Sequence, residues 1–275
     1  MTSIRRLALR VRRRLTWEMR CIVSPNKLAA FHLVDGSRFD YPIKSAIGYG
    51  LSMASFEIGE IAFMRQSLKP GDVVLDVGAN GGVFTLIAAK QVGPGGHVYA
   101  FEPGKRELHL LRHNISINSL TNVTIVERAV SNENSTAQFA IASDGALNSL
   151  GKTNHPQQKV ERWETVETIT LDDFAGRQNI FKVDFIKIDV EGAEKLVLEG
   201  AANLIASNPQ LKILFESYIV NTSGFNYSPN AFLAELIKSG LSVHYVKDTG
   251  LCPVTSTDDP QLGTQIYNFA ILPRN

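Results

Sequence analysis

The sequence predicts an α/β fold built on a mostly parallel, doubly wound sheet with one antiparallel edge strand. Three observations predict it. Short apolar runs alternate with amphipathic helical segments through most of the chain, as in βαβ units with right-handed crossovers. Several of these runs end in an acidic residue, which gathers polar groups at the carboxyl ends of the strands. The last two runs have no helix between them, which suits an antiparallel strand.

Length and composition set the outer limits. At 275 residues, the chain can bury a sizeable core as one large domain, with or without an appendage. We divide it into a basic helix with a small β appendage over residues 1–50 and a main domain over residues 51–275.

The net charge of +1 provides no overall field to recruit nucleic acid or acidic substrates. Cys21 and Cys252 show no metal spacing and do not look like a disulfide framework. With no apolar run of bilayer length and no signal-peptide core, we expect a cytoplasmic protein.

The N-terminal segment predicts a short basic amphipathic helix. Its arginines are Arg5, Arg6, Arg10, Arg12, Arg13 and Arg14. Its apolar residues at helical spacing are Ile4, Leu7, Ala8, Val11 and Leu15. Three interpretations stay open: peripheral contact with an anionic membrane, a solvated arm or a helix packed on its own domain or a dimer mate, and an organelle transit peptide. Residues 20–50 then read as short strands and turns, with a hairpin turn at Asp35-Gly36.

A helix is expected over residues 52–68, and the stretch that organises the chain follows at residues 73–82. There a β-branched run ends in Asp76, a glycine-rich turn follows, and a helix begins. Such a turn brings backbone N–H groups and the positive end of a helix dipole to one point, which suits an anionic group. Glycines let the backbone approach a ligand that β-carbons would block. The Asp76 carboxylate adds an acceptor for amino or hydroxyl groups.

Glycine spacing narrows the choice of ligand. The dinucleotide fingerprint G-x-G-x-x-G fails because its second and third glycines would fall at Asn80 and Val83. A phosphate loop fails because Gly151-Lys152-Thr153 would need its leading glycine at Ala146. The remaining D-x-G-x-N-G turn is typical of S-adenosylmethionine (SAM) binding, and the alternative is an ordinary βα turn.

The strand over residues 97–101 favours SAM. It ends in Glu102-Pro103, about 20 residues past the turn, where a βαβ unit places an acid. A carboxylate there can accept hydrogen bonds from both ribose hydroxyls, and Pro103 starts the next helix. The alternative for Glu102 is a solvated acid favoured by the helix dipole.

The remaining elements continue the alternation. A helix is expected over 105–118, a third strand over 122–130, and a polar insertion over 131–170 with strands at 138–141 and 164–170. Such an insertion is a substrate lid or a mobile connection. The later elements are a helix from 171, a buried strand over 183–190, a helix over 193–206, a strand over 211–215, a helix over 231–239, and closing strands over 243–246 and 269–272.

Strand order then predicts the place of the site. Ligands of open α/β sheets collect outside the carboxyl ends of the strands, where the strand order reverses. We expect the strand ending at Asp76 to lie beside the strand ending at Asp189, with both acids facing one cleft.

Four segments resemble the FkbM-type SAM-dependent methyltransferases, with the likeness running over about residues 56–273. They are KPGDVVLDVGANGG at 69–82, FEP at 101–103, LDDF at 171–174 and FIKIDVEGAE at 185–194. The resemblance implies a class I methyltransferase fold, Rossmann-like, with a seven-stranded, mostly parallel sheet and one antiparallel edge strand. It also implies SAM as cofactor and, usually, O-methylation of sugars or natural products.

The resemblance assigns roles residue by residue. The turn holds the methionine part of SAM, Glu102 with Pro103 the ribose, and Arg128-Ala129 the adenine edge. The turn residues are Gly78, Ala79, Asn80 and Gly81. The tip Asp189-Val190-Glu191 would lie beside the transferring methyl group.

Asp189 and Glu191 are the candidate catalytic residues. A hydroxyl acceptor must lose its proton, and a carboxylate can take that proton or orient the hydroxyl. The two acids would point the same way along an extended backbone, and their neighbouring charges could raise one pKa toward neutrality. The pair could bridge a metal, but nothing else supplies a ligand set, so we expect none. The alternatives are a SAM amino contact or helix cap for Asp189 and a solvated first-turn acid for Glu191.

Four further residues are weaker substrate-binding candidates. His155 could act as a base, although a lone loop histidine is usually solvated. Asn148 and Ser149 could close over the donor or could only form a turn. Glu216 could contact acceptor hydroxyls or could be an ordinary strand-end acid.

The sequence therefore favours an O-methyltransferase acting on a small molecule or glycan. A nucleic-acid methyltransferase is the first alternative, but no N-P-P-Y-type tetrapeptide follows the strand over 183–189 and no basic face exists beyond the N-terminal arm. A non-catalytic SAM-binding partner protein is the second, and the complete set of strand-tip acids argues against it. A nicotinamide oxidoreductase fails on glycine spacing. The acceptor pocket would be built from residues 131–170 and the N-terminal appendage.

Overall fold

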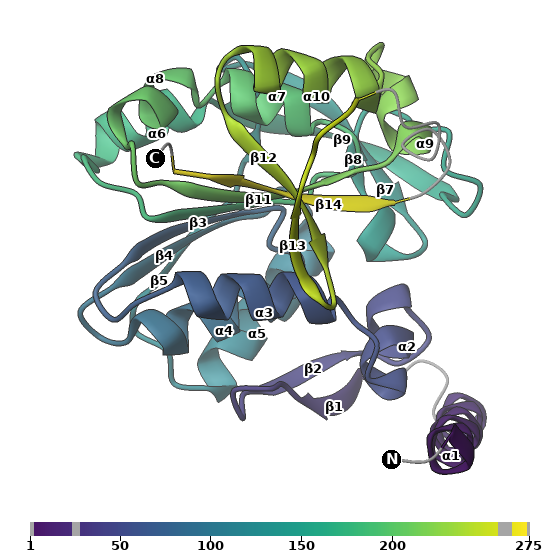
Figure 1. Ribbon diagram of the computed structural model, residues 1–275. Coiled ribbons are helices and arrows are strands. Elements are labelled where there is room, and N and C mark those ends of the chain that lie inside the picture. The colour runs from purple at the N-terminus through teal and green to yellow at the C-terminus, as the bar shows by residue number, and fades with distance from the viewer. Residues whose placement is uncertain (1–2, 24–27, 258–265, 274–275) are drawn as a thin grey trace.

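A computed structural model describes residues 3–23, 28–257 and 266–273, with side chains from Ala8 onward. Its centre is an eight-stranded sheet ordered β13-β12-β14-β11-β10-β3-β4-β5 (Figure 1). The strands are β3 (Val73–Val77), β4 (His97–Phe101), β5 (Val123–Val126), β10 (Phe185–Ile188), β11 (Lys212–Ser217), β12 (Ser242–Lys247), β13 (Gly250–Pro253) and β14 (Tyr267–Leu272). The predicted doubly wound class is confirmed.

The far end of the sheet differs in detail from the prediction. Strands β5, β4, β3, β10 and β11 are parallel, as expected. The antiparallel β14 inserts between β11 and β12 instead of closing the edge, because it pairs with both. A further antiparallel strand, β13, adds the eighth strand and forms the edge. It arises where Gly250, with φ +118°, lets the chain reverse directly after β12.

Helices cover both faces of this sheet (Figure 1). On one side lie α3 (Ile58–Ser67), α4 (Val83–Val92) and α5 (Lys105–Ile117). On the other lie α6 (Leu171–Gln178), α7 (Glu194–Glu199), α8 (Ala202–Ser207) and α10 (Pro229–Lys238). Each face has its own apolar cluster, so the sheet is buried on both sides as a parallel sheet requires.

The predicted insertion folds into a second sheet ordered β6-β9-β7-β8. Its strands are β6 (Ala129–Val130), β7 (Thr136–Ala142), β8 (Ser149–Leu150) and β9 (Val160–Ile169), with the short helix η1 (Gly145–Leu147) between β7 and β8. The segments expected as strands at 138–141 and 164–170 thus form most of β7 and β9. Beyond β11, α9 (Ile219–Thr222) and η2 (Ser223–Phe225) lead to α10.

The expected N-terminal helix and hairpin are present. Helix α1 (Ser3–Val23) packs against α2 (Ala46–Met53), so this basic helix lies on its own domain. Strands β1 (Leu28–His32) and β2 (Arg38–Pro42) form the hairpin, which turns at Asp35-Gly36 with φ +80° at the glycine. In the described part of the chain, no helix is both long and apolar enough to cross a membrane.

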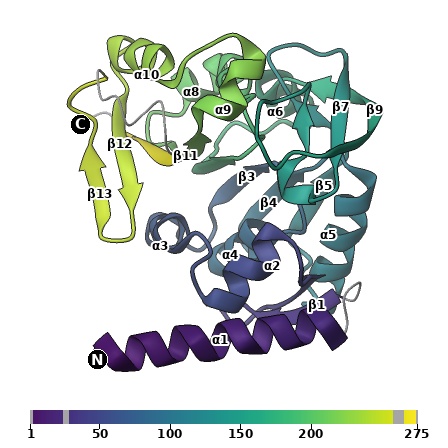
Figure 2. The ribbon, with the colours of Figure 1, turned by 90° about the vertical axis from the view of Figure 1, so that its right-hand side faces the viewer.

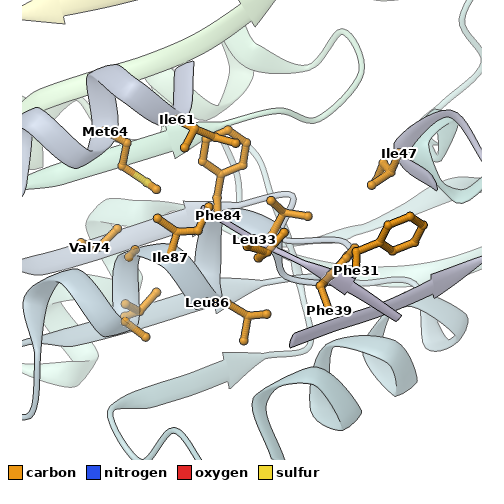
Figure 3. Close-up of a cluster of buried hydrophobic side chains, with 14 of the residues drawn as sticks. Phe31, Leu33, Phe39, Ile47, Ile61, Met64, Val74, Phe84, Leu86 and Ile87 are labelled. Carbon is orange, nitrogen blue, oxygen red and sulfur yellow. The ribbon is translucent and has the colours of Figure 1, made fainter. Parts of the chain in front are cut away.

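One apolar cluster joins this N-terminal part to the main domain (Figure 3). It includes Phe31 and Phe39 from the hairpin, Ile47 from α2, and Phe84 and Ile87 from α4. A domain boundary at residue 50 stays a prediction, because side chains on both sides of it share this core.

Three predicted elements are broken. The helix expected over 52–68 becomes α2 and α3, because Ala54 and Glu57 have left-handed backbones with φ of 51° and 41°. The helix expected over 193–206 ends at Gly200, where a β-carbon would lie 2.2 Å from the Ser131 carbonyl oxygen. The strand expected over 122–130 divides, and β6 pairs with β9 in the second sheet. Tertiary contacts override the local pattern in each case.

Candidate active site

The strand order reverses between β3 and β10, as predicted, and the glycine turn lies there. Gly78 follows β3 with φ +80°, and a β-carbon on it would lie 1.8 Å from the Asp189 carbonyl oxygen. Its N–H and that of Ala79 both donate to the Phe101 carbonyl oxygen, at 3.0 and 2.9 Å. The turn is therefore held tightly between β4 and β10, at a position that only glycine fits without strain.

Asn80 ties the turn to the hairpin and to the insertion. It has a left-handed backbone with φ 51°, and its Oδ1 accepts a hydrogen bond from the Tyr41 hydroxyl at 2.6 Å. Its Nδ2 donates to the Gly145 carbonyl oxygen at 3.0 Å. A β-carbon on the next residue, Gly81, would lie 2.5 Å from the Tyr41 ring. The hairpin thus supports the turn from behind.

Glu102 lies beside the turn at the end of β4. Its two carboxylate oxygens accept hydrogen bonds from the Asn80 N–H at 2.8 Å and from the Gly104 N–H at 2.7 Å. The side chain is 4% exposed. Burial, reinforced by Glu107, raises the Glu102 pKa to about 8 against the two backbone hydrogen bonds. Each oxygen keeps a lone pair for a ligand hydroxyl, because each accepts one bond here.

These residues line a cavity of about 750 Å³. Most of the predicted site residues lie in its wall. They are Gly78, Ala79, Asn80, Gly81, Glu102, Pro103, Arg128, Ala129, Asn148, His155, Asp189, Glu191 and Glu216. Asp76 and Ser149 are outside this lining. The cavity lies within the size range of small-molecule and cofactor sites.

Asp76 lies beneath the cavity instead of facing it, contrary to expectation. It is 1% exposed, stands in register with Lys187 on β10, and accepts a hydrogen bond at Oδ2 from the Thr85 hydroxyl at 2.5 Å. Its Oδ1 has no partner. Burial raises the Asp76 pKa, and the charge of Lys187 opposes this. A direct contact from Asp76 to SAM stays a prediction.

Lys187 is the buried cation beside the acids of the site. It is 5% exposed, lines the cavity, and places Nζ 2.8 Å from Asp189 Oδ2 and 4.7 Å from the centre of the Phe84 ring. Burial alone would lower the Lys187 pKa, but Asp189, Asp76 and Glu57 outweigh it and raise the pKa. Lys187 therefore stays charged beside Asp189 and Asp76.

Three carboxylates converge above it. Asp189, Glu191 and Glu216 each offer an oxygen, and these oxygens lie within 4.8 Å of one another. The Glu191 backbone is left-handed, with φ 55°, and not extended as predicted, yet its side chain still faces the cavity with Asp189. The spacing would allow a shared divalent cation, so a site without metal stays a prediction.

The cluster favours protonation of its buried members. Burial, together with Asp189 and Glu194, raises the Glu191 pKa well above its ordinary value, and burial with Asp189 does the same for the Glu216 pKa. Asn221 donates from Nδ2 to Glu191 Oε2 at 2.5 Å. The charge of Lys187 and the Asn221 hydrogen bond oppose this rise in the Glu191 pKa.

The other candidates are placed as follows. Arg128 lines the cavity while its guanidinium pairs with Glu167 at 2.8 Å. Asn148 Oδ1 accepts from the Ala142 N–H at 2.8 Å, which fixes the wall near η1. The His155 ring packs 5.9 Å from the Tyr218 ring, and burial lowers the His155 pKa. Ser149 is fully buried, and its hydroxyl donates to the Gly151 carbonyl oxygen at 2.9 Å.

Four residues of the site were missed by sequence reasoning. Lys187 could have been predicted, because a lysine inside the apolar run Phe185–Ile188 is buried with the strand and needs an acidic partner there. Glu57, half-buried on the cavity wall with its pKa raised to about 8 by burial, had none. No pattern in the neighbouring sequence marks Tyr41 or Asn221 as a site residue, because only packing between distant segments brings them to the site.

The residues present fit SAM. Gly78 and Gly81 let the turn pack against the Asp189 carbonyl and the Tyr41 ring, which leaves its other side on the cavity, and Glu102 presents a buried carboxyl group beside it. That combination suits an adenosyl ligand with a ribose diol and an amino-acid end.

Comparison with known proteins gives the same picture. The family described as "Methyltransferase FkbM domain" matches residues 76–245. A 31-O-demethyl-FK506 methyltransferase FkbM from Streptomyces tacrolimicus is 31% identical, over 55% of this chain and 72% of the relative. A 2-O-methyltransferase NoeI from Sinorhizobium fredii is 28% identical, over 48% and 58%. A solved structure from Clostridium thermocellum, named as a candidate rRNA methylase, shares the fold with a TM-score of 0.50 at 13% identity, covering 86% of this chain and 99% of that one.

Proposed function

This chain belongs to the FkbM methyltransferase family, and from that premise we propose that it methylates a hydroxyl oxygen of a sugar, glycan, glycolipid or natural product. SAM is the cofactor of this family and fold. When bound, it supplies a methyl group carried on a positively charged sulfur. The names of two relatives, a 31-O-demethyl-FK506 methyltransferase and a 2-O-methyltransferase, support oxygen as the acceptor atom.

The main support for this proposal is the acid cluster beside the glycine turn. Asp189, Glu191 and Glu216 bring carboxylate oxygens within 4.8 Å of one another on the wall of the same cavity as Gly78 and Glu102. A hydroxyl is a weak nucleophile until a base accepts its proton. A group of acids with raised proton affinity next to a methyl-donor cradle suits that demand.

The residues divide the work. Lys187 donates to Asp189 Oδ2 and fixes that side chain, so Asp189 can accept a hydrogen bond and orient the acceptor hydroxyl. Glu191, whose raised pKa makes it a stronger base once ionised, would take the proton of that hydroxyl, and SAM would supply the methyl group. Orientation of the attacking oxygen in line with that bond supplies much of the rate, so the rigid turn and the fixed acids act together.

A labelled-methyl assay against hydroxylated glycans and natural products tests the proposal. Glu191→Gln and Asp189→Asn should each lower kcat by about 100-fold, as the loss of a general base does. SAM affinity, measured by calorimetry, should change far less. Glu133→Gln, an exposed acid outside the cavity lining, is the matched control. Full turnover in both acid variants would remove the catalytic assignment. SAM binding without turnover on any hydroxyl acceptor would remove the proposed reaction.

A further inference from the structure

Helix α1 docks on the protein through the side that carries Arg13, Trp17 and Cys21. Trp17 donates from Nε1 to the Ile43 carbonyl oxygen at 2.9 Å and stacks edge-on against Tyr49 of α2, with ring centres 5.0 Å apart. Arg13 donates to the Met53 carbonyl oxygen at 3.0 Å. Cys21 on the same side is buried. Figure 2 shows α1 lying along the outside of the molecule beside α2 and β1.

The apolar side of α1 faces outward. Val11, Leu15, Met19 and Ile22 follow one another at spacings of four, four and three residues, so they form one stripe. They are 50, 55, 60 and 79% exposed. An amphipathic helix on a globular protein normally turns its apolar residues to the core. Helix α1 does so with Trp17 and Cys21, and the exposed stripe is a second apolar surface that can receive a partner.

Arginines border the stripe. At about 100° per residue, Arg12 lies on one side of it and Arg14 on the other, whereas Arg10 lies nearer the docking side, in the first half of the helix. Arg10 and Arg12 are exposed and form no salt bridge with any residue that the structure describes. A groove of about 390 Å³ also runs between α1 and β1, with Arg12, Arg13 and Arg20 in its wall. Glu18 pairs with Arg14 at the edge of the stripe, and the other charged side chains around the described part of the helix are arginines, so the surroundings of the apolar surface are mainly cationic.

We infer that α1 lies in the interface of an anionic lipid bilayer, with the stripe at the acyl boundary and the arginines among the phosphates. This is the arrangement of interfacial amphipathic helices, which combine apolar burial with attraction to negative headgroups. The charge of α1 favours an anionic lipid surface over a second copy of the chain as the partner. A symmetric dimer through α1 would bring two arginine-rich helices together, and their like charges would repel each other. The binding does not depend on the methyl acceptor.

The fold links this surface to the cavity. Helix α2, which packs on α1 through Tyr49, contributes Ala46, Ile47 and Gly50 to the cavity wall. The cavity therefore lies one helix away from the inferred lipid surface.

Vesicle flotation tests the inference with the full chain. Vesicles of equal parts phosphatidylcholine and phosphatidylglycerol should carry the protein at low salt, and vesicles of phosphatidylcholine alone should carry far less. Leu15→Glu with Met19→Glu should lower the partition at least tenfold. Arg10→Gln and Arg12→Gln should each lower it about fivefold. Phe181→Glu, which changes an apolar side chain that is 85% exposed elsewhere, should leave it unchanged.

Circular dichroism melting of each variant checks folding, and the altered side chains are exposed, so the melts should match. Equal partition of the Leu15→Glu, Met19→Glu variant would overturn the inference. So would a failure of the native chain to float with anionic vesicles. A dimer in sedimentation velocity that this double variant dissociates would instead assign the stripe to a second copy.

Discussion

A β-carbon at Gly78 would lie 1.8 Å from the Asp189 carbonyl oxygen, on a backbone with φ +80°. One methyl group there would force β3 and β10 apart at the point where the cavity begins. Single atoms of this kind decide whether the turn can hold a ligand, since the glycine both adopts the left-handed backbone and permits the close approach.

Gly78→Ala should therefore destabilise the protein by clearly more than the 1–2 kcal/mol of a left-handed backbone alone, and it should weaken SAM binding. Gly71→Ala is the matched control, because Gly71 has φ +92° and open space around its missing side chain. Urea unfolding and calorimetry measure the two effects. Equal losses of folding free energy in the two variants would show that the backbone around Asp189 shifts to accept the new methyl group at little energetic cost.

Lys187 is the second residue on which the site depends. It faces Asp189 and Asp76, and its positive charge lowers the pKa of Asp76, Glu57 and Glu191 against the effect of burial. A neutral side chain at this position would leave these acids without their cation.

Lys187→Met should therefore shift the rising limb of the kcat-against-pH profile to higher pH, because the acids would hold their protons more strongly. Lys187→Arg keeps the charge and should shift the limb less. Lys195→Met is the control, since Lys195 pairs with Glu235 and lies outside the cavity lining. An unshifted profile in Lys187→Met would mean that Lys187 supports the fold alone. If the Lys187→Met variant does not fold, the pH profiles of Lys187→Arg and Lys195→Met still show whether a change at position 187 moves the limb more than a change at position 195.

Among the elements, the β1–β2 hairpin has the least expected role. The sequence suggested an appendage near the site, but the hairpin supports the glycine turn directly. Tyr41 is 2% exposed, stacks on Phe39 with ring centres 5.2 Å apart, and donates to Asn80. The N-terminal segment thus helps to hold the glycine turn that we predict to bind the cofactor.

Tyr41→Phe should cost roughly 1 kcal/mol of folding free energy and raise the KM for SAM several-fold, because it removes one buried hydrogen bond and frees Asn80 to move. Tyr49→Phe on α2, 43% exposed and outside the cavity lining, should leave the KM for SAM unchanged. Denaturant unfolding and initial-rate kinetics give both values. A raised KM in the control as well would point to the whole N-terminal segment rather than to this hydrogen bond.

The molecule as a whole concentrates buried acids at one end of its sheet. Burial raises the pKa of Glu57 and Glu102 to about 8 and of Glu194 to about 7, from 4.5. The folded state therefore keeps protons that the unfolded chain releases above that value. Unfolding releases protons in this window, so each of these groups makes stability fall as pH rises from about 4.5 to its folded pKa.

Glu102→Gln removes one such group. Between pH 5 and pH 8, the ligand-free variant should lose stability less steeply than the native chain, by at most about 1.4 kcal/mol per pH unit. Urea unfolding across this range measures the difference, in which the contributions of the histidines cancel. Glu164→Gln, whose side chain pairs with Arg162, is the control and should follow the native slope. Parallel curves for native chain and Glu102→Gln would show that Glu102 is ionised in the folded state.

The sequence by itself determined the alternation of strands and helices, the turn at Gly78–Gly82 and the acids at the ends of β4, β10 and β11. These features depend on periodicity and glycine spacing, which are local. It also placed β3 beside β10, because reversal of strand order in an open parallel sheet follows from the handedness of its crossovers.

Only the tertiary structure decided which side chains meet in the cavity. Strand register put Asp76 opposite Lys187, and burial against Thr85 kept it out of the cavity lining. Packing of the hairpin and α9 brought in Tyr41 and Asn221. It also broke the helix at Glu57 and exposed the apolar side of α1. The direction of a side chain depends on contacts between segments distant in sequence, and no pattern within one segment carries that information.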